Sequence, residues 1–399
     1  MTILRQEDES MTHLCLNKLK IRNLACIENV DVDIRPFHAF IGPNDSGKST
    51  LLFAMDALFA FAKGESRPQN PWARHWEDGL EVKASVSLGG VGHTYGFSCD
   101  SQFDNGLYKE HFDGGFRAEE AGGVREWNRK DRYKSFEWGG YPIHGLKKEA
   151  QWKQVLDFFR GSVWLLRLDP EQLRKPSGLI RQGSEDDFVL SRGQGLPGFF
   201  DLIFNRGDGS LEEMQKRIRH HFPHVERLRL VNASNSAKAL QIELRDGTFV
   251  NPRKMSEGLL YFLAFLAIEF MEPPSMLLVE EPENGLHPAR VRDVVRVLEK
   301  ISKKTQVIMA THSPLVINEM KQENVSLVTR KEGEGTQVIL LSETKNFEER
   351  HKFYALGELW LNHADGEEES ALQPEKKEKA GNESGDDAKG GEVKGSKKK

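Results

Sequence analysis

An eight-residue run near the N-terminus has the residue types and spacing of a phosphate-binding loop. Gly42 to Ser49 reads Gly-Pro-Asn-Asp-Ser-Gly-Lys-Ser and matches the pattern GxxxxGK[ST] in full. In this pattern backbone N–H groups cradle phosphate oxygens, the lysine reaches the β- and γ-phosphates, and the following hydroxyl binds Mg²⁺. The sequence therefore predicts a site for ATP and Mg²⁺, with Ser49 as a metal ligand. The predicted nucleotide contacts are Gly42, Pro43, Asn44, Asp45, Ser46, Gly47, Lys48, Ser49 and Thr50.

The residues on either side of this loop favour a functional site over a glycine-rich turn without a function. His38 to Ile41 is a short apolar run that indicates a strand, and Thr50 to Phe61 is an apolar run that indicates a helix. The N-terminus of a helix carries a partial positive charge, which favours a phosphate anion there. Strand, loop and helix in this order are the arrangement that a phosphate-binding loop requires.

Acidic side chains follow a second predicted strand, and His312 follows a third, over residues 306–311. Met276 to Val279 is apolar throughout, as in a strand that is buried on both faces, and it leads into Glu280 and Glu281. Carboxylates at this end of a parallel strand lie beside the ligand crevice of the sheet. We expect Glu280 to hold Mg²⁺ through water, and we expect Glu281, His312 and Lys48 to be catalytic. Taken alone, the acidic run would more often be a solvated turn and the histidine would more often be structural.

The composition indicates a globular chain with a core. Of 399 residues, 38% are hydrophobic and 29% are charged, which excludes a largely disordered chain. A membrane-spanning helix is excluded because no apolar run reaches about 18 residues. The cysteines, Cys15, Cys26 and Cys99, lack the spacing of a zinc ribbon or a disulfide framework. The net charge of −5 excludes a generally basic nucleic-acid coat but permits a local basic patch. We expect a soluble cytoplasmic protein with no membrane partner.

Changes in composition divide the chain into five parts. We predict a flexible N-terminus over 1–12, a first ATPase block over 13–64, and an inserted α+β region over 65–252. A second ATPase block is predicted over 253–362. The segment 363–399 is charged and has almost no apolar residues, so it is predicted to be a disordered tail.

The pattern of apolar residues predicts an α/β fold with a largely parallel sheet. Strands are predicted over residues 276–280, 306–311, 325–329 and 337–341, with helices between the first three. The inserted region is predicted to contain antiparallel strands over 81–88 and 95–97. A capping box formed by Ser210 and Glu213 predicts the start of a helix at Ser210.

In this order the motifs resemble those of an ABC-type ATPase head. A signature segment at Met255 to Gly258 lies between the phosphate loop and the acid pair, and His312 stands where such heads have a switch histidine. The run Glu281-Pro-Glu-Asn-Gly-Leu-His-Pro288 is similar to the EEPE…LHP pattern of the RecF-like and overcoming-lysogenization-defect-like (OLD-like) ATPases. The resemblance covers two blocks, 14–62 and 255–329.

The resemblance implies that two heads pair face to face with ATP between them. Ser256, Glu257 and Gly258 of one subunit would cap the γ-phosphate that the other subunit holds. The loop from Asn284 to His287 would cross between the two sites. ATP would then join the subunits, which makes the protein at least a homodimer, and hydrolysis would release them.

The sequence also departs from the family pattern. Glu280 stands where many relatives have aspartate, which could alter the Mg²⁺ geometry. The signature reads MSEG rather than LSGGQ. The glutamine loop of the family is not placed, and Gln172 is one candidate for it.

Two absences narrow the resemblance. The segment between Ala62 and Met255 is too short for a long coiled-coil arm, and too few residues follow His312 for a nuclease domain of the toprim type. Such a head is similar to RecF, or to the ATPase subunits of the PARIS and Septu phage-defence systems. We therefore expect an ATP-driven switch without nuclease activity that controls a separate effector protein, with DNA or a phage protein as its trigger.

Two other functions remain as alternatives. A RecF-like DNA-repair clamp would bind duplex DNA directly, and the basic run from Lys216 to His221, with Arg227 and Arg229, is a candidate surface for it. The same run is also consistent with the solvated face of a helix. A membrane-transporter ATPase is disfavoured by the large insertion and by the EEPE pattern.

Overall fold

The fold is described from a computed structural model of the chain. It describes residues 14–63, 76–100, 107–114, 123–127, 146–180, 191–331, 333, 335–344, 347, 351 and 354–359. The predicted flexible N-terminus and the predicted disordered tail lie outside these residues.

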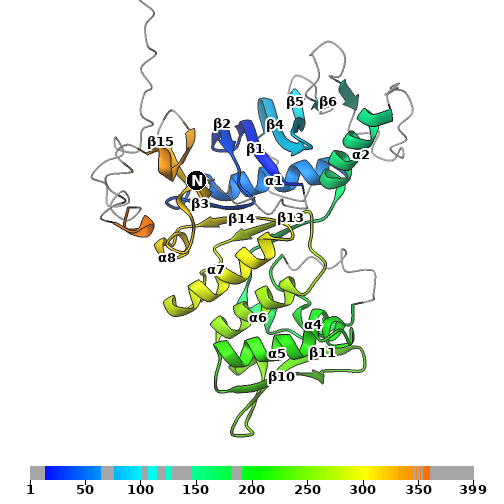
Figure 1. The fold of residues 1–399 in the computed structure, drawn as a ribbon, viewed down its shortest axis with the longest axis vertical. Helices are drawn as coiled ribbons and strands as arrows, with labels where there is room; N and C mark the ends of the chain where they lie inside the picture. The colour runs from blue at the N-terminus through cyan, green and yellow to red at the C-terminus, as the bar shows by residue number, and fades with distance from the viewer. Residues whose placement is uncertain are drawn as a thin grey trace, which may run out of the picture.

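A six-stranded, largely parallel sheet forms the centre of the molecule (Figure 1). Its order is β16 (Gly335–Leu340), β15 (Val325–Lys331), β3 (Phe37–Ile41), β14 (Gln306–Thr311), β13 (Met276–Glu280) and β8 (Val163–Leu166). Every neighbouring pair is parallel except β15 and β16, which are antiparallel. The strands predicted over 276–280, 306–311, 325–329 and 337–341 are therefore confirmed, and all lie in one sheet.

Helices cover both faces of this sheet, which explains the unbroken apolar runs of its inner strands. In β13, Met276 and Leu278 face one core, and Leu277 and Val279 face the other. Side chains alternate between the faces of a strand, so a strand that is covered on both sides needs apolar residues at every position. The phosphate loop and the carboxylates follow these strands, and they are held by a rigid scaffold.

An antiparallel sheet of six strands covers the first face together with two helices. Its order is β2 (Ile27–Asp33), β1 (Leu16–Leu24), β4 (Trp76–Leu88), β5 (Val91–Asp100), β6 (Leu107–Gly114) and β7 (Gly123–Trp127). The helices α1 (Lys48–Ala62) and α2 (Leu146–Arg160) share this core, and Figure 1 shows α1 between the antiparallel sheet and the central strands. The predicted antiparallel strands over 81–88 and 95–97 are confirmed as parts of β4 and β5.

Helices and a small sheet cover the second face. The helices are α3 (Pro170–Leu173), α4 (Leu196–Phe204), α5 (Ser210–His221), α6 (Glu257–Glu269), α7 (Pro288–Ser302) and α8 (Pro314–Ile317). The strands are β9 (Ser177–Gly178), β10 (Val225–Asn232), β11 (Ala237–Leu244) and β12 (Phe249–Val250). Short 3₁₀ helices lie at Pro252–Lys254, Gln322–Asn324 and Leu341–Glu343. In the described part of the chain, no helix has the length and apolar character needed to cross a membrane.

The helix predicted to start at Ser210 does start there, but the predicted capping box is wrong. Ser210 is the first residue inside α5, and its cap is Gly209 in the left-handed region at φ 85°. The side chain of Asp208 accepts a hydrogen bond from the N–H of Ser210 at 3.0 Å. The N–H of Glu213, which would donate to the hydroxyl of a capping Ser210, instead donates to the carbonyl oxygen of Gly209 at 3.2 Å, so the capping box is not formed.

The segment predicted as an insertion contributes strands to both large sheets. β4 pairs with β1 in the antiparallel sheet, and β8 pairs with β13 in parallel at the edge of the central sheet. Residues from 65 to 252 are therefore partly interwoven with the two ATPase blocks rather than wholly set apart from them.

Candidate nucleotide site

The phosphate loop lies between β3 and α1 in a conformation that two neighbouring strands constrain. Asp45 and Gly47 have positive φ angles of 64° and 107°. A Cβ atom on Gly42 would lie 2.0 Å from the carbonyl oxygen of Val328 in β15, and one on Gly47 would lie 2.5 Å from the hydroxyl of Thr336 in β16. Glycine is therefore required at both ends of the loop for steric reasons.

Thr336 in β16 holds the phosphate loop in place through hydrogen bonds. Its fully buried hydroxyl donates toward the carbonyl oxygens of Ser46 at 2.9 Å and Cys26 at 3.1 Å. The β1–β2 turn and β16 therefore meet under the loop. This contact could not be predicted from the sequence, because Thr336 lies far from the motif along the chain.

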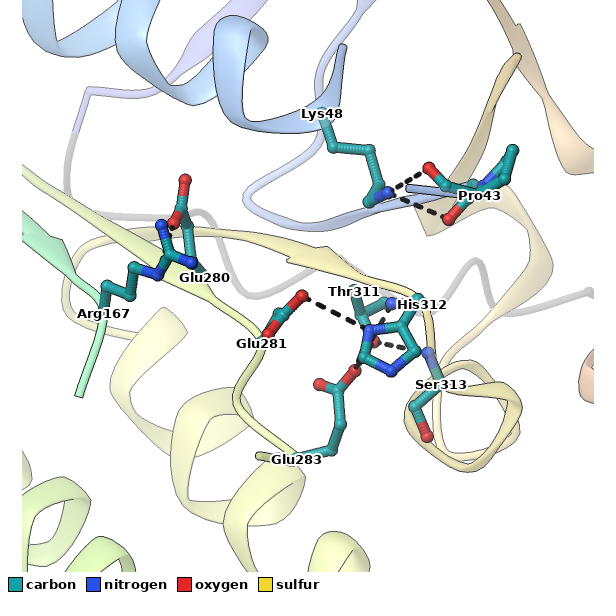
Figure 2. Close-up of polar contacts among 10 residues, drawn as sticks. Pro43, Lys48, Arg167, Glu280, Glu281, Glu283, Thr311, His312 and Ser313 are labelled. Carbon is teal, nitrogen blue, oxygen red and sulfur yellow. Dashed lines mark hydrogen bonds and ion pairs between the residues drawn. The ribbon is translucent and has the colours of Figure 1, made fainter. Parts of the chain in front are cut away.

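Lys48 is buried and points into the concave side of the loop (Figure 2). Its ammonium donates to the carbonyl oxygens of Gly42 at 2.9 Å and Pro43 at 2.6 Å. Burial lowers the pKa of Lys48, and the nearby carboxylates, Glu281 foremost, oppose this effect. The strand-end carboxylates are therefore close enough to Lys48 to influence its charge.

The loop fits a bound phosphate group. Among the described residues, the buried hydroxyl of Ser46 has no hydrogen-bond partner, and Lys48 has only carbonyl oxygens as partners. Phosphate oxygens would accept from both groups. The loop also ends at the N-terminus of α1, where an anion is favoured.

Glu281 follows β13 in an unusual backbone conformation. Its φ of 46° lies in the left-handed region, which costs a non-glycine residue about 1–3 kcal/mol. The Glu281 N–H still donates to the carbonyl oxygen of Ala310 in β14 at 2.8 Å, so the turn begins directly at the sheet edge. The Glu281 carboxylate lies 3.4 Å from Nδ1 of His312. The structure thus brings together Glu281 and His312, which the sequence predicted separately.

Glu283 connects the loop after β13 with the loop after β14 (Figure 2). Its Oε1 accepts from the Thr311 hydroxyl at 2.6 Å and from the His312 N–H at 3.3 Å, and it lies 3.5 Å from His312 Nδ1. The Thr311 hydroxyl in turn accepts from the Ser313 N–H at 2.9 Å. The side chain of Glu283 is 9% exposed and that of Glu281 is 36% exposed. Glu283 therefore holds the segment that carries His312, whereas Glu281 faces the open side of the site.

Glu280 has a partner that the sequence analysis did not select. Arg167, directly after β8, places its Nε 3.6 Å from Oε2 of Glu280. Gln172, the candidate for the glutamine loop, instead accepts from Lys175 at 3.0 Å on the exposed helix α3. Among the described residues, Arg167 rather than Gln172 contacts the strand-end carboxylates. The parallel pairing of β8 with β13 explains this, because it places both strand ends at one edge.

The signature segment begins α6. Ser256 is the N-cap, and its hydroxyl accepts from the Leu259 N–H at 3.3 Å. Glu257 and Gly258 form the first turn, where helix N–H groups remain available to an anion. The described residues include no hydrogen bond or ion pair between Ser256–Gly258 and the phosphate loop of the same chain.

The loop from Asn284 to His287 lies against this first turn. A Cβ atom on Gly285 would be 2.9 Å from the Glu257 carboxylate and from the ring of Tyr261. His287 is the N-cap of α7, and its Nδ1 accepts from the Ala289 N–H at 3.2 Å. The Asn284 N–H donates to the Glu281 carbonyl at 2.9 Å.

The predicted site residues thus form two groups. The first consists of the phosphate-site residues, which are Lys48, Ser49, Glu280, Glu281 and His312. The second, which we call the cap group, consists of Ser256, Glu257, Gly258 and the loop from Asn284 to His287.

The residues fit a magnesium site of the kind that depends on substrate phosphates. No cluster of three or more histidine, cysteine, aspartate or glutamate residues suited to a metal occurs in the described part of the chain. Mg²⁺ in nucleotide enzymes commonly takes one or two protein ligands together with phosphate oxygens and waters. Ser49 is exposed at the start of α1, and Glu280 follows the central strand β13.

Two family models match the chain. One is described as an AAA ATPase domain and matches residues 15–93. The other is described as an AAA domain, putative AbiEii toxin, Type IV TA system, and matches residues 149–318. Two segments of the chain are therefore similar to AAA-family ATPase domains. The second match includes β8, the cap group and the acid pair, so this part of the predicted insertion matches an ATPase family too.

A solved structure supports the same fold. A crystal structure of an Smc head bound to the C-terminal winged-helix domain of ScpA superposes with a TM-score of 0.51 at 14% identity, covering 81% of this chain and 97% of that one. The predicted fold class, an ABC-type ATPase head, is therefore confirmed.

Two curated proteins match over short segments. An OLD nuclease of Thermus scotoductus is 42% identical over 43 residues, which are 11% of this chain and 8% of that protein. The cell division ATP-binding protein FtsE of Mycobacterium tuberculosis is 38% identical over 63 residues, which are 16% of this chain and 27% of FtsE. The matches span far less than two thirds of either protein.

Proposed function

We propose that this protein is a Mg²⁺-dependent ATPase whose heads pair around ATP and separate after hydrolysis. The observation that supports this most strongly is the separation of Ser256–Gly258, at the start of α6, from the phosphate loop of the same chain. The cap group begins α6 and α7 on the second face of the sheet, and it has no polar contact with the phosphate loop of its own chain among the described residues. A cap supplied by a second head would complete the site.

The phosphate-site residues would bind and activate ATP within one head. Lys48 would exchange its two carbonyl partners for phosphate oxygens. Ser49 and Glu280 would hold Mg²⁺, which supplies charge neutralisation of the phosphates when bound. Glu281 would orient and polarise the attacking water, and His312, 3.4 Å away, would face the γ-phosphate.

The cap group would act on the ATP of the partner head. Ser256 and Gly258 stand where the N–H groups of α6 would meet a γ-phosphate, as expected for an anion at a helix N-terminus. Because Gly285 packs against Glu257, a movement of the loop after Glu281 would displace Glu257 in the cap group. Hydrolysis in one site could thereby loosen the pair.

We further propose that the paired state controls a separate effector in anti-phage defence, and that the chain itself is not a nuclease. The description of the matched family names a toxin of a toxin–antitoxin system, and the similar Smc head was crystallised with a domain of another protein. Both support a head that works with a partner protein. The carboxylates of the described site, Glu280 and Glu281, are assigned to ATP in this account.

Mixing two inactive variants tests the head pairing. Lys48→Ala removes the phosphate-binding cation, and Ser256→Arg blocks the cap, so each variant alone should lack ATP turnover. A mixed pair would contain one intact site, with Lys48 from one chain and Ser256 from the other. We expect the mixture to regain partial turnover, and equal inactivity of the mixture and of each variant would contradict pairing.

A pull-down tests the effector. The tagged full-length chain is purified from its native host with ATP, with ADP and without nucleotide, and co-purifying proteins are identified. We expect a product of a neighbouring gene to be retained in a nucleotide-dependent way by the wild type and not by Lys48→Ala. Retention of no protein under any condition would contradict effector control.

A further inference from the structure

An open groove of about 540 Å³ on the second face of the molecule is lined mainly by cations. Lys216, Arg217 and Arg219 come from α5, Arg245 follows β11, and Lys300 lies in the last turn of α7. We call this feature the α5 groove. Figure 1 shows α5 next to β10 and β11, on the far side of α6 and α7 from the antiparallel sheet.

The α5 groove has an excess of positive charge although the chain as a whole is negative. Arg217 and Lys300 share one buried carboxylate, Glu269, each at 2.5 Å. Within the described residues, Lys216, Arg219 and Arg245 have no acidic partner. The Arg219 side chain donates to the backbone carbonyl of Glu226 at 3.3 Å. Only one acidic residue, Glu213, lines the groove beside these five cations.

The groove lining indicates the chemistry of its ligand. The lining contains cations, two histidines and Glu213, and it offers no aliphatic residue, phenylalanine, tyrosine or tryptophan. Protein interfaces depend on buried apolar or aromatic anchors, which are missing from this lining. Lysine and arginine side chains spread over several elements suit a ligand with repeated phosphates. We propose that the α5 groove binds the phosphate backbone of a nucleic acid without reading its sequence.

The position of the groove separates this binding from the ATP site. Lys300 lies near the end of α7, whose N-cap is His287, and Glu269 is the last residue of α6, whose N-cap is Ser256. These helices of 15 and 13 residues are about 20 Å long at 1.5 Å per residue. The Lys300 end of the α5 groove therefore lies at the opposite end of α7 from the cap group, and His221 extends the groove toward Asp293, nearer the start of α7, at 3.0 Å. Nucleic acid at the Lys300 end would compete neither with ATP nor with a second head.

A charge-reversal variant tests the groove without any nucleotide. The variant Lys216→Glu, Arg219→Glu, Arg245→Glu changes only cations that lack acidic partners. The matched control, Lys20→Glu, Arg35→Glu, Lys321→Glu, makes the same change in net charge at positions outside the groove. The probes are a fluorescently labelled DNA duplex of arbitrary sequence, the same DNA as a single strand, and an RNA duplex, and binding is followed by anisotropy over a range of salt concentrations.

We expect the wild type and the control to bind and the groove variant to lose at least about tenfold in affinity. The slope of log affinity against log salt should fall by about 3, since each lost phosphate contact contributes about 0.9. The three probes show whether DNA or RNA geometry is preferred. Circular dichroism and unchanged ATP turnover without nucleic acid confirm that the variants are folded.

Three results would overturn the proposal. These are no binding by the wild type at low salt, an equal loss in the groove variant and the control, or displacement of the DNA by polyglutamate as effectively as by unlabelled DNA. None of them bears on head pairing, which the mixing experiment tests by ATP turnover alone.

Discussion

At the scale of single residues, Glu283 is the side chain whose role was least visible in the sequence. It stands in an acidic run and looks like one more exposed carboxylate, yet its side chain is only 9% exposed and contacts both Thr311 and His312. Glu283 thus acts as a positioning residue for the segment that carries His312. Two separate local motifs identified Lys48 and Glu281, but they could not show which carboxylate of the acidic run faces the substrate.

Glu283→Ala should reduce ATP turnover while leaving nucleotide binding nearly unchanged. The change removes the acceptor for the Thr311 hydroxyl and the His312 N–H, so His312 loses its orientation, whereas Lys48 and the phosphate loop keep their contacts. Glu283→Gln retains one acceptor oxygen and should recover part of the turnover. Steady-state ATPase assays and binding of a fluorescent ATP analogue measure the two effects. A loss of binding as large as the loss of turnover would contradict the positioning role.

His38 should make the protein sensitive to mild acid. It is fully buried in β3, with Nε2 3.1 Å from the Ser326 hydroxyl, and burial lowers its pKa to about 3. The unfolded chain takes up this proton below pH 6.5, so the stability contributed by neutral His38 is present above pH 6.5 and is lost as pH falls toward 3. Between pH 7 and pH 5 the free energy of unfolding should fall by about 2 kcal/mol from this residue alone.

Urea unfolding of the wild type and His38→Gln at both pH values measures this contribution. The glutamine amide can keep the contact with Ser326 but does not titrate. The wild type should therefore lose about 2 kcal/mol more than the variant between pH 7 and pH 5. Equal losses would show that His38 is not the group responsible.

At the scale of elements, the sequence predicted those strands and helices whose pattern is complete within a few residues. The strands at 276–280 and 306–311 have apolar interiors, Met276 to Val279 and Val307 to Ala310, because both faces are buried, and their predicted bounds agree with β13 and β14. The start of α5 at Ser210 was predicted correctly, but the predicted capping box is not formed, because the Glu213 N–H donates to the carbonyl oxygen of Gly209.

Contacts between distant segments could not be read from local patterns. β8 has four residues and finds its place only by pairing with β13, more than a hundred residues later. The contact of Arg167 with Glu280 and the support of the phosphate loop by Thr336 depend on such pairings. Propensity and periodicity describe neighbours along the chain, and these residues become neighbours only in the folded sheet.

Gln306 joins the two large sheets and should be important for stability. Its buried amide accepts from the Leu16 N–H at 2.7 Å and donates to the carbonyl oxygens of Leu16 at 2.7 Å and Arg35 at 3.1 Å. Gln306→Leu would leave these buried backbone groups without partners, at about 1–3 kcal/mol each. We expect a loss of about 2–5 kcal/mol in the free energy of unfolding.

Chemical denaturation of Gln306→Leu measures this loss, with Gln241→Leu as the control. Gln241 makes a hydrogen bond to Asn251 at the surface, so its replacement should change stability by less than about 0.5 kcal/mol. Gln306 is the first residue of β14, and the phosphate-site residues lie beyond the other end of that strand. The folded variant should therefore still bind ATP. A variant as stable as the control would refute the assigned role of Gln306.

At the scale of the whole molecule, the central sheet separates two cores with different tasks. The first core packs α1 and the antiparallel sheet behind the phosphate loop. The second packs α6 and α7, which carry the cap group at their N-termini and end at the α5 groove. In the proposed pairing, a second chain would bring these two parts of the nucleotide site together.

Sizing of Glu281→Gln with and without ATP tests this pairing most directly. The amide keeps the shape of the side chain but cannot polarise water, so ATP should stay bound and unhydrolysed. Light scattering coupled to size-exclusion chromatography should show a larger assembly, at least a dimer, with ATP and Mg²⁺, and a smaller species without nucleotide. The double variant Lys48→Ala, Glu281→Gln should remain in the smaller form. A monomer under every condition, with ATP demonstrably bound, would contradict the pairing of heads around ATP.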